Sequence, residues 1–188
     1  GLLSFDHAIE GQLRLNGQEL DFSAGRGYIE KDWGRSFPKT WVWLQCNHFE
    51  TAGVSLSASI ALIPNLGRVF PGFIVGLQLE GELHAFTTYE RSKVEWLQLE
   101  GDRLRWILLN ATHRLEIEVQ RGPSVPLPAP TLDGMERVVH ESLSARVELR
   151  LLRLPDAKLV YAGCGECAGL EIEGPIHKLT PNRQRTKM

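Results

Sequence analysis

Acidic, basic and aromatic side chains are concentrated between residues 28 and 50, in the stretch YIEKDWGRSFPKTWVWLQCNHFE. Glu30 and Asp32 lie next to Trp33 there. A carboxyl group beside indole rings loses hydration, which favours its protonated form and allows it to act as a general acid. Neighbouring Lys31 and Arg35 favour the ionised form instead. The spacing therefore leaves two interpretations open, a proton-donating cluster and a surface group of ion pairs.

The second half of this stretch has the spacing of a β-strand. If residues 41–49 are extended, alternate side chains share a face, and one face then carries Trp41, Trp43, Gln45, Asn47 and Phe49. The other face, with Val42, Leu44, Cys46 and His48, is typical of apolar packing. Each buried carboxamide without a partner costs about 1–3 kcal/mol, and a ligand with a polar end would supply one. Equally, the carboxamides could bond neighbouring backbone while the tryptophans pack in a core.

The elements around this stretch are predicted to be β-strands. Short alternating runs are separated by turn signals, and Asn16–Gly17 is a strong signal for a two-residue hairpin. No segment keeps an apolar helical period over ten residues. We therefore expect an all-β fold, either a barrel or a sandwich.

The same pass along the chain predicts one domain over residues 1–188. The proline-rich segment at about 121–135 is expected to be an extended, irregular loop, with a lid over an opening as its expected role. Residues 178–188 are expected to form a basic, frayed tail.

Composition excludes several classes of function. The net charge of −2 gives no electrostatic case for nucleic acid, and no apolar run approaches the ~20 residues of a membrane helix. With 3 cysteines the expected compartment is reducing, and we expect a cytoplasmic location, with membrane association left open. Cys164 and Cys167 form a lone CxxC without the other ligands of a zinc site, so we expect no metal.

The stretch GRGYIEKDWGRSFPKTWVWLQCNHF closely resembles the signature of the tocopherol cyclase family, EKxWGxSFPxxWxWxQxN followed by an aromatic residue. The match runs from Glu30 to Phe49. The stretches IALIPNLGRVFPGFIVGLQLEGELHAFTTY, ESLSARVELRLL and CAGLEIEG also look like the bacterial branch of this family.

This resemblance implies a lipocalin-like or calycin-like β architecture, either an antiparallel barrel or a strongly curved sandwich. Whole family members are longer and contain two β units, and this chain looks like the C-terminal one. The resemblance thus implies an N-terminal partner domain or, failing that, a homodimer. Named members close a chroman ring on a prenyl quinol as isomerases, without a redox cofactor or metal.

The resemblance also implies roles for individual residues. Glu30 or Asp32 would donate the proton, while Lys31 and Arg35 would adjust their protonation or bind a polar head. The tryptophans would face the cation, each contributing about 0.5–2 kcal/mol; they are Trp33, Trp41 and Trp43. The quinol oxygens would be held by Gln45 and Asn47.

The expected partner is thus a hydrophobic, prenylated or lipidic small molecule, with peripheral membrane contact as a further expectation. Two alternatives to the cyclase remain open at this point. One is a non-catalytic lipid carrier or sensor with the same binding site. The other is a structural half-domain that pairs with its missing partner through an exposed sheet face.

Overall fold

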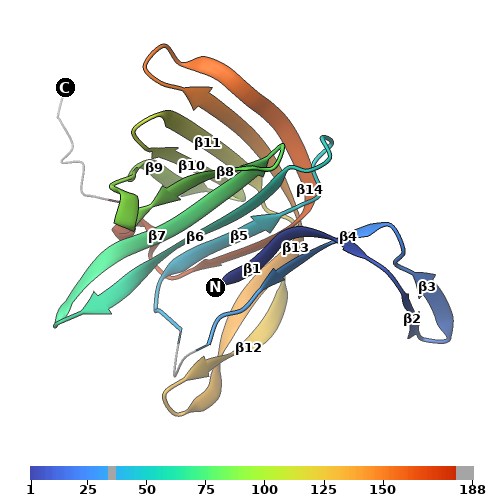
Figure 1. The fold of residues 1–188 in the computed structure, drawn as a ribbon. Helices are drawn as coiled ribbons and strands as arrows, with labels where there is room; N and C mark the ends of the chain where they lie inside the picture. The colour runs from blue at the N-terminus through green and yellow to red at the C-terminus, as the bar shows by residue number, and fades with distance from the viewer. Residues whose placement is uncertain (34–36, 181–188) are drawn as a thin grey trace.

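The computed structural model describes residues 1–33 and 37–180, and these residues form β-strands joined by turns (Figure 1). The strands are β1 (Leu2–Ile9), β2 (Gln12–Leu15), β3 (Gln18–Asp21), β4 (Gly25–Glu30), β5 (Trp41–Cys46), β6 (Ser55–Asn65), β7 (Arg68–Leu79), β8 (Glu82–Thr87), β9 (Lys93–Glu100), β10 (Arg103–Leu109), β11 (His113–Gln120), β12 (Val125–Thr131), β13 (Gly134–Arg153) and β14 (Lys158–Glu173). Two short 3-10 helices, η1 (Thr88–Glu90) and η2 (Ile176–Lys178), complete the described part. The all-β prediction is confirmed.

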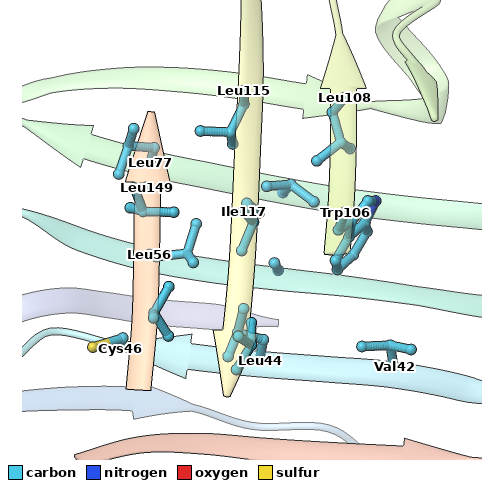
Figure 2. Close-up of a cluster of buried hydrophobic side chains, with 14 of the residues drawn as sticks. Val42, Leu44, Cys46, Leu56, Leu77, Trp106, Leu108, Leu115, Ile117 and Leu149 are labelled. Atoms are coloured by element: carbon cyan, nitrogen blue, oxygen red, sulfur yellow. The ribbon is translucent and has the colours of Figure 1, made fainter. Parts of the chain in front are cut away.

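One antiparallel sheet of ten strands dominates the fold. Its order is β8-β7-β6-β5-β14-β13-β11-β10-β9, and β12 pairs with β13 beside this path. The long strands β13 and β14 have register shifts at which the sheet bends, because a bulge kinks a strand and increases its twist. The bend folds the sheet into two layers, and the strands of one cross those of the other steeply (Figure 2).

The edge strands β8 and β9 follow each other in the chain but do not pair in the described structure. The 3-10 helix η1 carries the chain between them, from one layer to the other. The fold is therefore the strongly curved sandwich of the two predicted forms, and the closed barrel is not formed.

The space between the layers is filled with apolar side chains. Leu44 and Leu56 reach in from one layer, and Ile117 and Leu149 reach in from the other (Figure 2). Each is at most 1% exposed, and burial of such a side chain contributes about 1.5–3 kcal/mol. Since the interior is packed, a ligand site has to lie on an outer face of the sandwich.

The two outer faces differ in chemistry. On the β10–β11–β13 layer, ion pairs join neighbouring strands. Arg103 pairs with Glu118, and Arg150 pairs with Glu116. On the β5–β7 layer, the register aligns Ser59 of β6 with Trp43 and Ile74, so uncharged side chains cross this face. The first outer face is a typical solvated surface, whereas the second can accept an apolar molecule.

Two pairs of strands cover parts of this uncharged face. Strand β1, paired with β4, lies over β6, and the Ser55 hydroxyl donates to the Phe5 carbonyl over 2.8 Å. From the other side, Ala129 and Val139 of the β12–β13 hairpin pack against Trp41. The uncharged face between these two strand pairs is the part that remains accessible.

The predicted hairpin at Asn16–Gly17 is confirmed. It joins β2 to β3 and projects from the body (Figure 1). Its turn residues have φ of 50° and 82°, as a turn with two left-handed residues requires.

The proline-rich segment was wrongly predicted to be an irregular loop, because residues 125–131 form strand β12. Its prolines recur at positions 126, 128 and 130, so all the missing N–H groups lie on one side of the strand. The other side remains able to pair with β13. Of the predicted basic tail, residues 181–188 lie outside the described structure.

Across residues 1–33 and 37–180 there is no helix with the length and apolar character that a membrane crossing requires.

Candidate functional site

Strand β5 separates its side chains onto two faces, as its sequence predicts. Leu44 and Cys46 are fully buried in the core, whereas Trp43 and Gln45 lie half-buried on the outer face. Burial raises the pKa of the Cys46 thiol to about 11, so this thiol stays protonated. The strand ends at Cys46, and Phe49 forms a bridge with Gly165 and belongs to the core. The prediction that Phe49 shares the tryptophan face was therefore wrong, because the chain turns after β5.

Glu30, at the end of β4, is held by two donors. The Trp43 indole Nε1 donates to Glu30 Oε2 over 2.8 Å, and the Tyr28 hydroxyl donates to the same oxygen. The Tyr28 hydroxyl also lies 3.1 Å from Ser57 Oγ. Burial, followed by the hydrogen bond to Glu30, raises the pKa of Tyr28 well above its ordinary value. Tyr28 is consequently a fixed hydrogen-bond donor at neutral pH.

A pocket of about 460 Å³ opens beside this cluster, between β1 and the β6–β8 part of the sheet. Glu30 and Ser57 contribute to its wall. The rest of the lining is mainly apolar or small, and includes Phe5, Ile63, Phe70, Ile74, Gly76 and Ala85. Apolar walls with a few polar groups, at this volume, are typical of small-molecule sites.

A second pocket of about 400 Å³ lies next to the first, and the two share Asp32, Ser59, Ala61 and Ile63. Its other walls are aromatic and acidic, formed by Trp33, Phe37, Trp41, Trp43, Glu141 and Glu171. We call the two pockets together the Trp43 groove. It combines an apolar compartment with one that presents indoles and carboxyl groups.

Glu171 of β14 is a partly buried acid in the wall of the second pocket. The Trp41 indole Nε1 donates to its Oε2 over 2.8 Å, and Glu141 lies opposite it on β13. Burial raises the pKa of Glu171 above its ordinary value, and the charges of Glu141 and Glu173 add to this effect. The Trp41 hydrogen bond and Arg137 act in the other direction but do not cancel it.

Arg137 of β13 fixes one end of the groove. Its guanidinium lies 4.5 Å from the centre of the Trp41 ring, donates to the Pro38 carbonyl over 2.7 Å and lies 3.6 Å from Glu173. These contacts tie the segment before β5 to β13 and β14. A guanidinium on an aromatic face contributes about 0.5–2 kcal/mol.

The other predicted catalytic residues, Asp32 and Lys31, and the predicted ligand contact Trp33 are exposed. The Asp32 side chain is 64% exposed and lies 2.8 Å from the amino group of Gly1, although Asp32 lines both pockets. Lys31 is exposed. Trp33 is 86% exposed and forms part of the second pocket. Arg35 lies outside the described residues.

The two predicted carboxamides bond each other. Gln45 Nε2 donates to Asn47 Oδ1 over 3.3 Å, and neither residue belongs to the walls of the Trp43 groove. Glu30 and the tryptophans are thus brought together by the fold, whereas this pair lies beyond the groove.

Sequence reasoning missed five residues in the walls of the groove or bonded beside them. Tyr28 lies two residues before Glu30 in a strand, so period-2 spacing could have identified it. The same alternation places Ser57 with Ser59. Glu171 and Arg137 carried no local signal, since their positions depend on the register of β13, β14 and β5.

The CxxC residues do not form a metal site in the described structure. Cys164 is half-buried and Cys167 is exposed, and both are free thiols. Across the described residues, no group of three His, Cys, Asp or Glu side chains is arranged to hold a metal ion.

Comparison with known proteins gives a consistent family. The family model described as tocopherol cyclase-like matches residues 4–174, which include all the groove residues named above. The chain is similar to a probable chloroplastic tocopherol cyclase of Oryza sativa subsp. japonica, with 26% identity over 174 residues, 87% of this chain and 37% of that protein. It is also similar to a chloroplastic tocopherol cyclase of Zea mays, with 34% identity over 132 residues, 66% of this chain and 27% of that protein. The chain thus spans well under half the length of these relatives, and it belongs to the tocopherol cyclase-like family.

Proposed function

We propose that the Trp43 groove binds a hydrophobic small molecule of the prenylated quinol class and closes it to a chromanol by acid catalysis. The observation that supports this most is the Glu30 carboxyl group, held by Trp43 and Tyr28 at the wall of a mainly apolar pocket. The printed names of the relatives, which are tocopherol cyclases, agree with this substrate class.

The reaction adds one proton to the substrate and removes another from it. A proton adds to a carbon of the prenyl double bond, and a tertiary cation forms at the other carbon. The phenolic oxygen then bonds to the cation and loses its proton, so the product is an isomer of the substrate. No electrons are exchanged with a cofactor. Glu30 serves as a proton-transfer group in this scheme, and such groups accelerate reactions by about 10²–10⁴.

Aromatic side chains in the groove can stabilise the cation. Arg137 already occupies one face of the Trp41 ring, so we assign the cation contact to Trp43 and Trp33, which also line the second pocket. Hydroxyl groups at the first pocket suit the ring oxygens of the ligand. They are supplied by Ser57 and Ser59, beside Tyr28.

The test is incubation of the protein with dimethylphytyl benzoquinol in detergent, followed by mass spectrometry of the chromanol. We expect product from the wild type and a loss of about 10²-fold or more in Glu30→Gln. Glu19→Gln, on the projecting β2–β3 hairpin, is the matched control and should act like the wild type. Absence of product from the wild type, or equal product from Glu30→Gln, would refute the proposal.

A non-catalytic lipid carrier is the second candidate. The predominantly apolar lining of the first pocket favours it, because such a lining binds a lipid without using the acids. This candidate predicts copurified lipid in native mass spectra, and binding that survives Glu30→Gln but is weakened by Trp43→Ala. Turnover that depends on Glu30 would show that the protein is not only a lipid carrier.

A further inference from the structure

We infer that the two protons of this reaction are handled by two different carboxyl groups, with Glu171 donating to the alkene and Glu30 accepting from the phenol. The inference rests on the proposed function and assigns a role to a residue that lies 130 positions after Trp41 in the chain. Its basis is the arrangement of both acids around one indole.

Trp43 is bonded to one of the two acids and pairs in register with the other. In the register of the sheet, Trp43 is directly opposite Glu171 on β14 and opposite Ser59 on β6. Neighbouring strands are about 4.8 Å apart, so Glu171 flanks the indole from one side. Glu30 bonds the indole Nε1 from β4, which covers the sheet. A ligand lying over Trp43 would therefore have one acid in each of the two adjoining pockets.

The reaction itself separates the two roles. The proton is added to a carbon of the side chain and is lost from an oxygen of the ring, and these atoms occupy different positions. If Glu171 transfers its proton to carbon, the positive charge forms beside the indoles of the second pocket. Glu30 then takes the phenolic proton as the new C–O bond forms. Exchange with water afterwards removes the proton from Glu30 and returns one to Glu171, so that the cycle can repeat.

The surroundings of the two acids favour this assignment. Glu171 has two further acids beside it, Glu141 across the strand pair and Glu173 on its own strand. Among the described residues, the cation near it is Arg137, which is shared between Glu173 and the Trp41 ring. Burial and these charges raise the pKa of Glu171, which keeps a proton available. At Glu30, by contrast, Oε2 accepts hydrogen bonds from an indole and a phenol, so this group is oriented as an acceptor.

The experiment compares wild type, Glu171→Gln, Glu171→Asp and Glu148→Gln with dimethylphytyl benzoquinol. Single-turnover rates are measured across a pH series, and ligand affinity is measured by tryptophan fluorescence. Glu148 lies exposed on the charged outer face of β13 and is the matched control.

We expect Glu171→Gln to lower the rate by about 10²-fold or more while ligand affinity is kept. The wild-type rate should fall as pH rises and Glu171 loses its proton, and this fall should be absent from Glu171→Gln. Glu171→Asp should restore part of the rate.

A readout without turnover tests the proton directly. In a pH series, infrared spectra of the ligand-free wild type should contain a protonated carboxyl band that persists above the ordinary titration range of Glu and is missing from Glu171→Gln. Wild-type turnover with an equal rate in Glu171→Gln would overturn the inference and leave the proposed function standing. No turnover by the wild type would overturn both. If Glu171→Gln fails to fold, as circular dichroism would show, a Glu171→Asp rate equal to wild type with an unchanged pH profile would overturn the inference.

Discussion

The indole Nε1 of Trp43 lies 2.8 Å from Glu30 Oε2 and donates a hydrogen bond to it. This bond joins β5, in the centre of the uncharged face, to β4, which with β1 covers that face. The position of the covering strands is thereby coupled to a side chain in the wall of the second pocket. Changes at Trp43 should consequently affect the cover and the groove together.

Trp43→Phe tests this coupling, because it keeps an aromatic ring and removes the N–H donor. Loss of one hydrogen bond should lower the free energy of unfolding by about 0.5–1.5 kcal/mol, measured by urea denaturation, and chromanol formation should decrease. Trp33→Phe is the control for stability, since Trp33 is 86% exposed and should give no measurable change. Equal stability and activity of Trp43→Phe and wild type would contradict the coupling.

Leu44→Ala should lower the free energy of unfolding much more than Trp43→Phe, although Leu44 is the next residue in the strand. Its side chain is 0% exposed in the core between the layers, and such truncations cost about 2–5 kcal/mol. The measurement is again the urea unfolding free energy. Leu13→Ala on the β2–β3 hairpin, where the side chain is 62% exposed, should change it by less than about 0.5 kcal/mol. Similar values for the two variants would show that β5 does not bury this face.

These two residues show what local pattern can predict. Period-2 spacing separates Trp43 from Leu44 correctly, because alternation is a property of the strand itself. The Asn16–Gly17 hairpin is equally local. The bend of the sheet is not, since it depends on register shifts between β13 and β14 that no single segment encodes. The sequence therefore predicted strands and faces but left open whether the sheet closes.

The residues of the site also divide into those that local sequence predicts and those that only strand pairing places. Glu30 and Trp43 belong to one contiguous motif and were predicted from it. Glu171 and Arg137 reach Trp41 from more than ninety positions away, and only the pairing of β14 with β5 brings Glu171 there. The partnership of Gln45 with Asn47 was also not predictable, because β5 ends between them.

Gly169→Ala should disturb the groove through Trp43. A Cβ at position 169 would lie 2.9 Å from Cζ3 of the Trp43 indole, which is closer than van der Waals contact allows. We expect a loss of about 1–3 kcal/mol in unfolding free energy from overpacking, together with weaker ligand binding. In a Trp43→Ala background the same substitution should cost less, because the ring it meets is gone. An equal cost in both backgrounds would place the strain elsewhere.

The stability of Glu171→Gln relative to wild type should depend on pH. Burial raises the folded-state pKa of Glu171 above its ordinary value of 4.5, so the fold favours the protonated carboxyl. The stability gained from this preference is fully present below the unfolded pKa and is lost as pH rises through the folded pKa. Glutamine is uncharged at every pH and does not suffer that loss.

Urea unfolding at a series of pH values should therefore show Glu171→Gln gaining stability relative to wild type toward neutral pH. Glu148→Gln, an exposed control, should show a small difference that varies little with pH. A constant difference between Glu171→Gln and wild type, or one that favours wild type as pH rises, would contradict the protonated state assigned to Glu171.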